Sequence, residues 1–290
     1  MNVKRLSSFA IAAVLAMVVP LFSLFACPKF SAPIAVGTLQ DGDITETSGI
    51  VASTLSAGTL WIHQDSGAKP TIYAITGNGE VIATCTLPSA QAVDWEDIAR
   101  GTSSNGKSSL YIGDIGDNRF HRRDITVYRL PEPLISPSVD IAFDDVETFH
   151  LIYPDRPHDA ETLLFDPTFD ELYVITKWDS RSRIYRAKLE KPGMTTTLEH
   201  VGDLPFNGAT GGDVSGDGES VVIRTYFAAY IWQRDSTRPL WKSLVEQQGC
   251  YVKLATEPQG EAICFTSEGD LMTVSEGKTP TIYRYTFLSP

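Results

Sequence analysis

The sequence predicts an all-β protein folded as a five-bladed β-propeller, and three observations lead to this fold class. Five segments repeat one pattern along the chain. Turn-forming residues are frequent, with 22 Gly and 17 Pro among 290 residues. Beyond residue 30, the apolar period of a helix never persists for more than one or two turns. Many short strands joined by turns fit these observations better than helices do.

Each repeat begins with a polar or acidic residue, continues as a short apolar strand and a turn, and ends with a second strand. The repeats start 48, 65, 49 and 51 residues apart. Further strand-like runs follow, so each unit holds about four strands, as a propeller blade does. Six blades are the alternative if the long second unit hides one, and a two-sheet sandwich would leave the repeat unexplained. The starting residues are Ser48, Glu96, Glu161, Thr210 and Glu261.

The last unit contains only three strands and ends at TIYRYTF, residues 281–287. The segment PIAVGTL, residues 33–39, could supply the missing fourth strand. Such pairing of the two chain ends would close the ring and remove exposed sheet edges. We therefore expect an N-terminal strand to complete the last blade.

The first 26 residues are expected to be a secretory signal rather than part of the fold. Lys4 and Arg5 form a basic start, and residues 9–26 are largely apolar. A retained membrane anchor is the alternative, although the stretch is barely long enough to span a bilayer. The chain thus divides into a signal peptide at 1–26 and a single propeller domain at 27–290. The domain is expected to work outside the cytoplasm, secreted or lipid-anchored to the cell envelope.

The four cysteines leave two questions open. The segment LFAC, residues 24–27, resembles a bacterial lipobox in which Cys27 would carry lipid and tether the protein to a membrane. Phe25 departs from the small or β-branched residue usual there. Cys250 and Cys264 could bridge adjacent strands, which would leave Cys85 outside a bridge. The spacing of the cysteines fits neither a zinc site nor a CxxC redox site.

The residue that opens each repeat is the main functional signal. In a propeller the innermost strands run side by side along the central channel, so these five positions meet around the axis. Three carboxylates in one narrow channel repel one another unless they are protonated or bridged by a cation. Oxygen ligands suit Ca²⁺ better than Mg²⁺ or zinc. The sequence therefore predicts a central calcium site, with hydrogen bonding to channel waters alone as the alternative. The predicted ligands are Ser48, Glu96, Glu161, Thr210 and Glu261.

The order Ser, Glu, Glu, hydroxyl, Glu over five blades resembles the calcium-activated nucleotidases (apyrases). WEDIA, LYIGDIGD and HDAETLLF also read like the blade openings of that family. This resemblance implies a five-bladed propeller with a central calcium, although Thr210 stands where that family places Ser. The phrases DWEDIA, GDIGDN, DAE and QGEAI are more closely similar to a group of secreted bacterial β-propeller proteins of unassigned activity. That second resemblance implies fold and compartment but not chemistry.

Charged residues are also expected at the channel rim, where second strands end and loops enter. Two cations beside a calcium, Lys177 and Arg224, could hold a phosphate while an acid such as Asp114 or Asp159 activates water. His158 is the best candidate for proton transfer. In the alternative interpretation, Lys177 and Arg224 pair with neighbouring acids and fix the loops. The same rim is expected to receive Asp65, Asp94, Asp117, Asn118 and Glu276.

Two classes of function follow from these features. The first is a binding module with a calcium site, whose rim contacts a small anionic ligand or a protein partner, and which acts as a monomer. The alternative is a calcium-dependent phosphohydrolase, nucleotidase-like or phosphoesterase-like, so the sequence leaves open whether the protein is an enzyme. The 24 Lys and Arg against 36 Asp and Glu give a net charge of −12, which argues against nucleic-acid binding.

Overall fold

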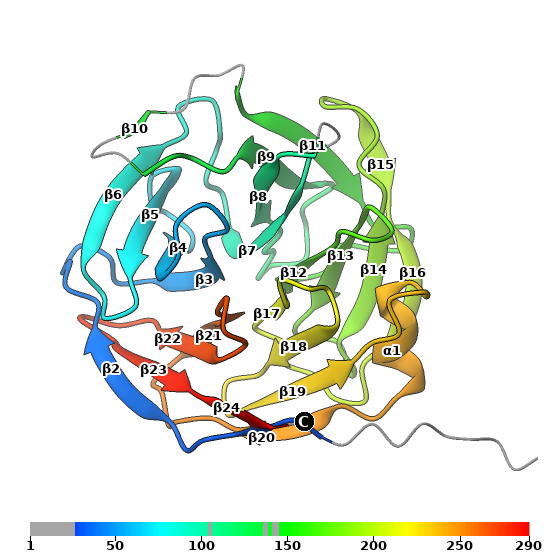
Figure 1. The fold of residues 1–290 in the computed structure, drawn as a ribbon. Coiled ribbons are helices and arrows are strands. Elements are labelled where there is room, and N and C mark those ends of the chain that lie inside the picture. The colour runs from blue at the N-terminus through cyan, green and yellow to red at the C-terminus, as the bar shows by residue number, and fades with distance from the viewer. Residues whose placement is uncertain (1–26, 104–105, 136–138, 141–144, 290) are drawn as a thin grey trace, which may run out of the picture.

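The computed structural model describes residues 27–103, 106–135, 139–140 and 145–289, and the predicted signal peptide at 1–26 lies outside them. Five mainly antiparallel sheets are arranged as blades around a central channel (Figure 1). The innermost strands of neighbouring blades contact one another all the way round. The structure therefore confirms the five-bladed propeller that the repeat predicts.

The strands of each blade follow one another outward from the channel. Blade 1 consists of β3 (Thr47–Ala52), β4 (Thr59–Gln64), β5 (Thr71–Thr76) and β6 (Val81–Thr86). Blade 2 consists of β7 (Trp95–Thr102), β8 (Ser108–Asp114), β9 (Ile125–Pro131) and β11 (Glu147–Ile152). Blade 3 consists of β12 (Ala160–Asp166), β13 (Glu171–Thr176), β14 (Arg183–Ala187) and β16 (Glu199–Asp203). Blade 4 consists of β17 (Gly211–Val214), β18 (Ser220–Arg224), β19 (Ala228–Gln233) and β20 (Cys250–Lys253). Blade 5 contains β21 (Gly260–Phe265), β22 (Leu271–Ser275) and β23 (Thr281–Tyr285).

Short elements cover some of the outer edges. β10 (Val139–Asp140) pairs in parallel with β6, and β15 (Thr195–Thr197) pairs in parallel with β11. The helix α1 (Leu240–Glu246) precedes β20 and contacts β16 of the neighbouring blade. No helix within the described part of the chain is long and apolar enough to cross a membrane.

The ring is closed by the first strands that the structure describes. β2 (Ile34–Thr38) pairs with β23 and becomes the outermost strand of blade 5. This confirms the closure predicted from PIAVGTL. β1 (Lys29–Phe30) also pairs with β24 (Phe287–Ser289), so both ends of the described chain lie side by side. With β2 in place, blade 5 has four strands and β23 is not left as an exposed sheet edge.

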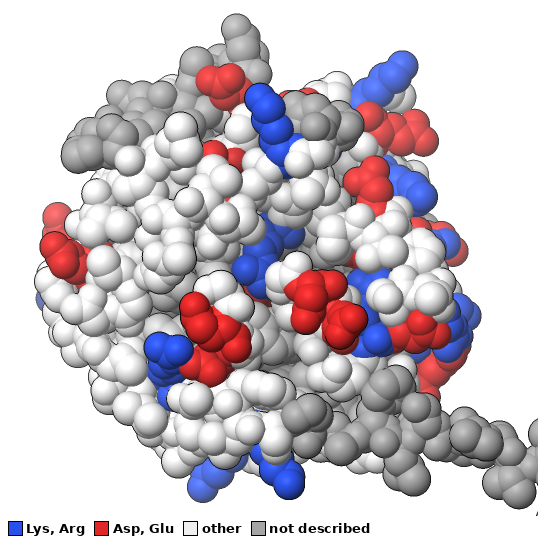
Figure 2. Space-filling model, viewed as in Figure 1, with Lys and Arg blue, Asp and Glu red and all other residues white. Residues whose placement is uncertain are grey.

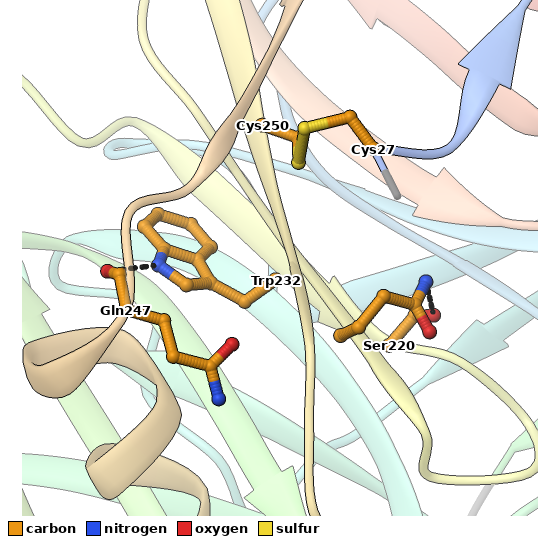
Figure 3. Close-up of a disulfide and its surroundings, with 6 residues drawn as sticks. Cys27, Ser220, Trp232, Gln247 and Cys250 are labelled. Atoms are coloured by element: carbon orange, nitrogen blue, oxygen red, sulfur yellow. Dashed lines mark hydrogen bonds between the residues drawn. A yellow bond between two sulfur atoms is a disulfide. The ribbon is translucent and has the colours of Figure 1, made fainter. Parts of the chain in front are cut away.

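A disulfide fastens the closure to blade 4. Cys27 is bonded to Cys250 at the start of β20 (Figure 3). The bridge joins residues 223 positions apart; in the chain-entropy model such a loop contributes on the order of 5 kcal/mol of stability. The possible bridge between Cys250 and Cys264 does not form, because Cys250 is bonded to Cys27 and Cys264 is buried between blades 5 and 1. A sulfur in a disulfide cannot also carry a lipid thioether, so this bridge and lipidation of Cys27 exclude each other.

The apolar core forms five layers, one between each pair of neighbouring blades. In β4, Trp61 packs toward blade 2, whereas Leu60 and Ile62 pack toward blade 5. Successive side chains of a strand point to opposite faces, and both faces of a blade are covered. For this reason consecutive residues of β4, from Leu60 to Ile62, are all apolar and do not alternate with polar ones. Apart from this core, Figure 2 shows basic side chains near the centre of one face and acidic ones interspersed around them.

Candidate metal centre

The five residues predicted to ring the channel lie together at one end of the innermost strands. The strands β3, β7, β12, β17 and β21 succeed one another around the axis. Each of the five predicted residues begins its strand or stands next to its first residue, and each is at most 3% exposed: Ser48, Glu96, Glu161, Thr210 and Glu261.

In four blades the ring residue is the extra residue of a β-bulge. The register between the first and second strands shifts at that single position. A bulge bends its strand and turns one side chain out of the regular alternation, which here directs it toward the channel. In blade 4 the register of β17 and β18 runs without a shift, and the ring residue stands before the strand. The bulged residues are Ser48, Glu96, Glu161 and Glu261.

Carboxylates converge in two overlapping groups at this end. Glu96, Asp159 and Glu161 each offer one oxygen, and these oxygens lie within 4.8 Å of one another. Asp65, Asp94 and Glu96 form a second group with the same spacing. We call these groups the inner triplet and the outer triplet, because the inner one is fully buried and Asp65 and Asp94 are half-buried. Glu96 belongs to both.

Several of these oxygens lack a hydrogen-bond donor. Within the described residues, Asp159 Oδ2, Glu161 Oε2 and Glu261 Oε2 are buried and have no partner. The other oxygen of Asp159 accepts a hydrogen bond from the backbone N–H of Asp117 at 2.8 Å. A buried carboxylate oxygen without a donor costs several kcal/mol unless the group is protonated or a cation binds it. These oxygens are therefore the ones that protonation or a bound cation would have to satisfy.

The electrostatics of the cluster favour the neutral forms of these carboxylates when no cation is bound. Burial, followed by the charges of neighbouring carboxylates, raises the pKa of Glu96 well above its ordinary value. Burial likewise raises the pKa of Asp65 to about 7, that of Asp94 to about 6 and that of Glu276 to about 9. Burial also raises the pKa of Glu161, although Lys177 opposes it. A divalent cation would lower all these values by favouring the charged forms.

Lys177 is the basic side chain that faces the ring. Its Nζ forms an ion pair with Glu161 and lies 3.8 Å from an oxygen of Glu261. It also lies 4.9 Å from the centre of each of the Trp178 and Tyr226 rings. Burial alone would lower the pKa of Lys177, but its pairing with Glu161 outweighs burial and raises it. Lys177 thus stays charged and offsets part of the acidic cluster.

The two predicted hydroxyl ligands have a different role. Ser48 Oγ donates to the backbone carbonyl of Glu96 in the next blade. Thr210 Oγ1 donates to the carbonyl of Gly260 at 3.2 Å. Both hydroxyls therefore connect neighbouring blades, and neither belongs to a triplet. The inner triplet combines two of the predicted ligands, Glu96 and Glu161, with Asp159, which the sequence placed only among the catalytic candidates.

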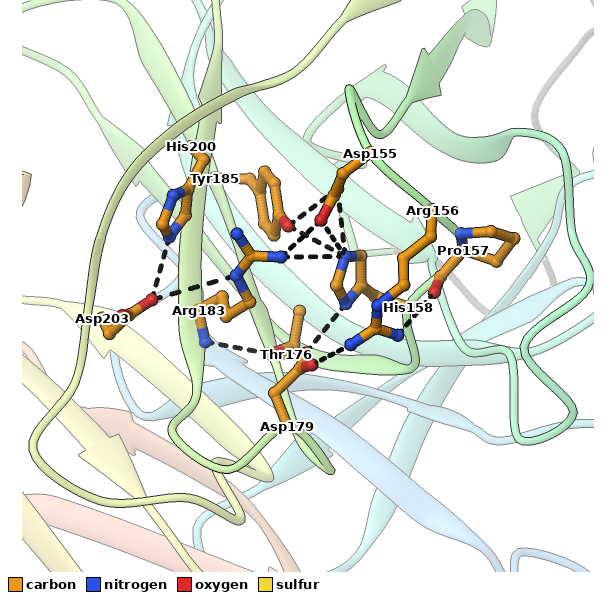
Figure 4. A network of polar contacts seen from close by, with 10 residues as sticks. All are labelled: Asp155, Arg156, Pro157, His158, Thr176, Asp179, Arg183, Tyr185, His200 and Asp203. Carbon is orange, nitrogen blue, oxygen red and sulfur yellow. Dashed lines mark hydrogen bonds and ion pairs between the residues drawn. The ribbon is translucent and has the colours of Figure 1, made fainter.

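Of the remaining catalytic candidates, His158 lies away from the ring in a network of its own (Figure 4). Its side chain is buried, with Nδ1 2.8 Å from Asp179 Oδ2 and Nε2 3.2 Å from Asp155 Oδ1. The hydroxyl of Tyr185 lies 2.9 Å from Nε2. Both ring nitrogens are occupied by these contacts, so His158 fixes the loop after β11 and is not available for proton transfer at the triplets.

Arg224 and Asp114 are also occupied. Arg224 is fully buried and forms an ion pair with Glu257 at 2.8 Å. Asp114 accepts hydrogen bonds from the backbone N–H groups of the loop that enters β7 and pairs with Arg122 at 2.7 Å. These contacts match the alternative interpretation, in which the rim charges fix loops. Glu257 was not singled out in the sequence. It lies in the loop between β20 and β21, and no local pattern links that loop to Arg224 at the end of β18.

Tyr226 is a residue whose role the sequence pattern obscures. Its place in an aromatic recurrence with Trp61, Tyr111 and Tyr173 suggests blade packing, and those three are indeed buried core residues. Tyr226 instead lies in the turn after β18, and its hydroxyl donates to Glu261 Oε1 at 3.3 Å. It therefore belongs to the acidic end of the channel.

No family model matches this chain, and no curated protein matches it by sequence. Among solved structures it is similar to the PQQ-bound aldose sugar dehydrogenase from Streptomyces coelicolor. That alignment has 10% identity and a TM-score of 0.50, and covers 89% of this chain and 97% of that one. A luciferin-regenerating enzyme aligns over 89% of this chain and 96% of that one, at 12% identity and a TM-score of 0.46. Such low identity shows only the fold, and the class it defines is the β-propeller.

Proposed function

We propose that this protein is an extracytoplasmic β-propeller that binds calcium at the acidic end of its channel and acts as a ligand- or partner-binding module. The observation that carries the proposal is the inner triplet, whose oxygens lie within 4.8 Å of one another. Two of its carboxylates, Asp159 and Glu161, each keep a buried oxygen without a donor in the described chain. A cation would supply the missing partner and cancel the repulsion between the carboxylates.

Calcium fits these donors better than other divalent ions do. Calcium takes six to eight oxygens at about 2.3–2.6 Å, so two oxygens on one ion can lie up to about 5 Å apart. The donors of the inner triplet are all carboxylate oxygens at compatible separations. Magnesium demands a tighter octahedron, and zinc prefers His and Cys ligands, of which neither triplet has any.

The cation would also control what the module binds. Without it, the concentrated carboxylates repel a small anionic ligand; with it, open coordination positions can accept a carboxylate or phosphate oxygen. Trp178 and Phe227, 52% and 79% exposed, follow Lys177 and Tyr226 directly in sequence. They offer apolar contact next to the ring. We therefore expect a small anion to bind only to the calcium-loaded protein.

The phosphohydrolase alternative is weakened by the contacts of its proposed residues. It required Lys177 and Arg224 to hold a phosphate, and both are engaged in buried ion pairs. It required His158 near the site, and His158 lies between two aspartates elsewhere. We therefore keep the binding module as the proposed function.

The proposed compartment has one further support. The Cys27–Cys250 bridge closes the ring, and such disulfides persist in oxidising compartments. This agrees with the secretory signal expected from residues 1–26.

A thermal unfolding experiment tests the cation site. Calcium in place of EDTA should raise the melting temperature of the protein, because an ion that binds only the folded state stabilises it. Glu161→Gln should abolish most of this shift. Glu80→Gln is the matched control, since Glu80 is exposed in the turn after β5 and should leave the shift unchanged. A wild-type midpoint that is the same in calcium and in EDTA would refute the proposal.

A further inference from the structure

Glu96 is shared by two groups of carboxylates, and one calcium ion at the inner triplet leaves the other group without a partner. We infer that the channel end holds two cations, one at each triplet, with Glu96 as the carboxylate that bridges them. This inference rests on the proposed function, since it adds a second ion to the same site. It is carried by the contacts of Asp65, Asp94 and Glu96.

The outer triplet has no positive charge of its own. Within the described residues, none of Asp65, Asp94 and Glu96 forms an ion pair with a basic side chain. The nearby Arg122 is engaged elsewhere, since its guanidinium donates to Asp114 at 2.7 Å and to the carbonyl of Gly116 at 2.8 Å. Lys177 faces Glu161 and Glu261 instead. A cation at the inner triplet alone would therefore leave Asp65 and Asp94 without an ion pair, although the charge of Arg122 acts on Asp94 from a distance.

Glu96 brings a buried carboxylate into this group. It is 2% exposed, and its Oε2 receives only a long hydrogen bond of 3.4 Å from Ser48. No donor within the described chain bonds its Oε1. Two oxygens with so few partners can bind two ions, one on each side of the carboxylate. Two-metal centres in proteins use shared ligands in this way, with ions about 3.5–4 Å apart.

Gly116 shapes the outer position. A Cβ atom added there would lie 2.2 Å from Glu96 Oε1 and 2.5 Å from Asp94 Oδ2. The backbone of residue 116 therefore passes close to both oxygens, and only a glycine leaves room for them. Its N–H donates to the carbonyl of Asp94 at 3.2 Å, which holds the two loops together. This contact holds the backbone of residue 116 next to Asp94.

The charge at this end also exceeds what one ion can offset. Seven carboxylates interact with one another here, and among the described residues Lys177 is the basic side chain that forms ion pairs with any of them. With all seven carboxylates ionised, one divalent cation together with Lys177 would leave four negative charges in a largely buried cluster. A second cation reduces that repulsion. The carboxylates are Asp65, Asp94, Glu96, Asp159, Glu161, Glu261 and Glu276.

Equilibrium dialysis of the purified protein against calcium alone tests the inference by counting bound ions. The wild type should bind two ions. Asp65→Asn and Asp94→Asn should each lose the outer ion, Asp159→Asn should lose the inner one, and Glu96→Gln should weaken both at least tenfold. Asp43→Asn, an exposed aspartate outside the cluster, should still bind two. Each variant is checked by its unfolding curve in EDTA, so that loss of an ion is not confused with loss of the fold.

The outcomes separate this inference from the proposed function. One ion in the wild type, lost in Asp159→Asn but kept in Asp65→Asn, would overturn the second site and leave the proposed function standing. No ion at all would overturn both. Gly116→Ala gives an independent check, because the added methyl must displace Asp94 and Glu96. It should weaken the outer ion, and unchanged binding of two ions by this variant would contradict the shared position.

Discussion

Two neighbouring residues, Glu96 and Asp97, are both buried acids in blade 2, yet their surroundings differ completely. Asp97 Oδ1 accepts the N–H of Ile98 at 2.9 Å, and Oδ2 accepts those of Leu163 at 2.9 Å and Gly212 at 3.2 Å. Glu96 faces other carboxylates and receives one long bond from a hydroxyl. The first acid ties three blades together, whereas the second has a single weak donor.

Blade 4 contains a second buried acid whose oxygens are satisfied by donors. Asp213, in blade 4, resembles Asp97: it accepts N–H groups of Val214 at 2.8 Å and Phe265 at 2.9 Å and lies 3.5 Å from Arg100. We call Asp97 and Asp213 the brace carboxylates. Burial raises the pKa of Asp97 as it does that of Glu96, so a shifted pKa does not distinguish the two kinds. What distinguishes them is whether donors satisfy the oxygens.

Removing a brace should have the largest effect. Asp97→Ala leaves three backbone N–H groups without their acceptor, two of them in other blades, and should lower the free energy of unfolding by about 4 kcal/mol. Asp97→Asn keeps one acceptor oxygen and should cost about half as much. Chemical denaturation in EDTA measures both. A loss of less than about 1 kcal/mol for Asp97→Ala would show that a brace carboxylate stabilises the fold no more than a channel carboxylate such as Glu96 does.

The contribution of Asp213, the second brace carboxylate, to the stability of the fold should depend on pH. Burial raises the pKa of Asp213 from 3.8 to about 6, so between these values the folded state binds more protons than the unfolded state. Stability due to Asp213 is then greatest at low pH and falls as pH rises from 4 to 6, by up to about 3 kcal/mol.

The measurement is the difference in unfolding free energy between wild type and Asp213→Asn across this pH range in EDTA. The wild type should lose stability relative to the variant as pH rises. A difference that does not change with pH would show that Asp213 does not titrate in this window.

Lys177→Met should raise calcium affinity about tenfold, about 1.4 kcal/mol, because it removes a positive charge that competes with the ion. The control is Lys242→Met. The Nζ of Lys242 also lies over a tryptophan, 3.9 Å from the centre of the Trp241 ring, but this lysine belongs to α1 and is partly exposed. Calcium titration monitored by thermal unfolding measures both variants. If Lys177→Met binds calcium like the wild type or more weakly, the lysine does not compete with a cation.

The smallest effect is expected for Glu96→Gln in EDTA. Replacing a carboxylate among carboxylates by a neutral amide removes repulsion, so the metal-free protein should keep its stability or gain up to about 1 kcal/mol. This is opposite in sign to Asp97→Ala at the next position. A loss of more than about 1 kcal/mol in EDTA would show that Glu96 is a structural residue like its neighbour.

The repeat made much of the fold predictable. Five polar residues at nearly constant spacing, each before an apolar strand, are enough to predict five blades and to place Glu96, Glu161 and Glu261 at one end of the channel. The closing strand was predictable as well, because the last unit lacked one strand and residues 33–39 could supply it. Both predictions depend on local pattern and on the symmetry of the propeller.

The sequence by itself thus determined the blades, their order and the acidic ring. Only the tertiary structure decided that Ser48 and Thr210 bond neighbouring backbone, that Asp159 joins the carboxylates, and that Cys27 bonds Cys250. These features depend on contacts between residues far apart in the chain. A strand pattern repeats locally and can be read from spacing, whereas the partner of a buried polar atom is known only when the neighbouring blade is in place.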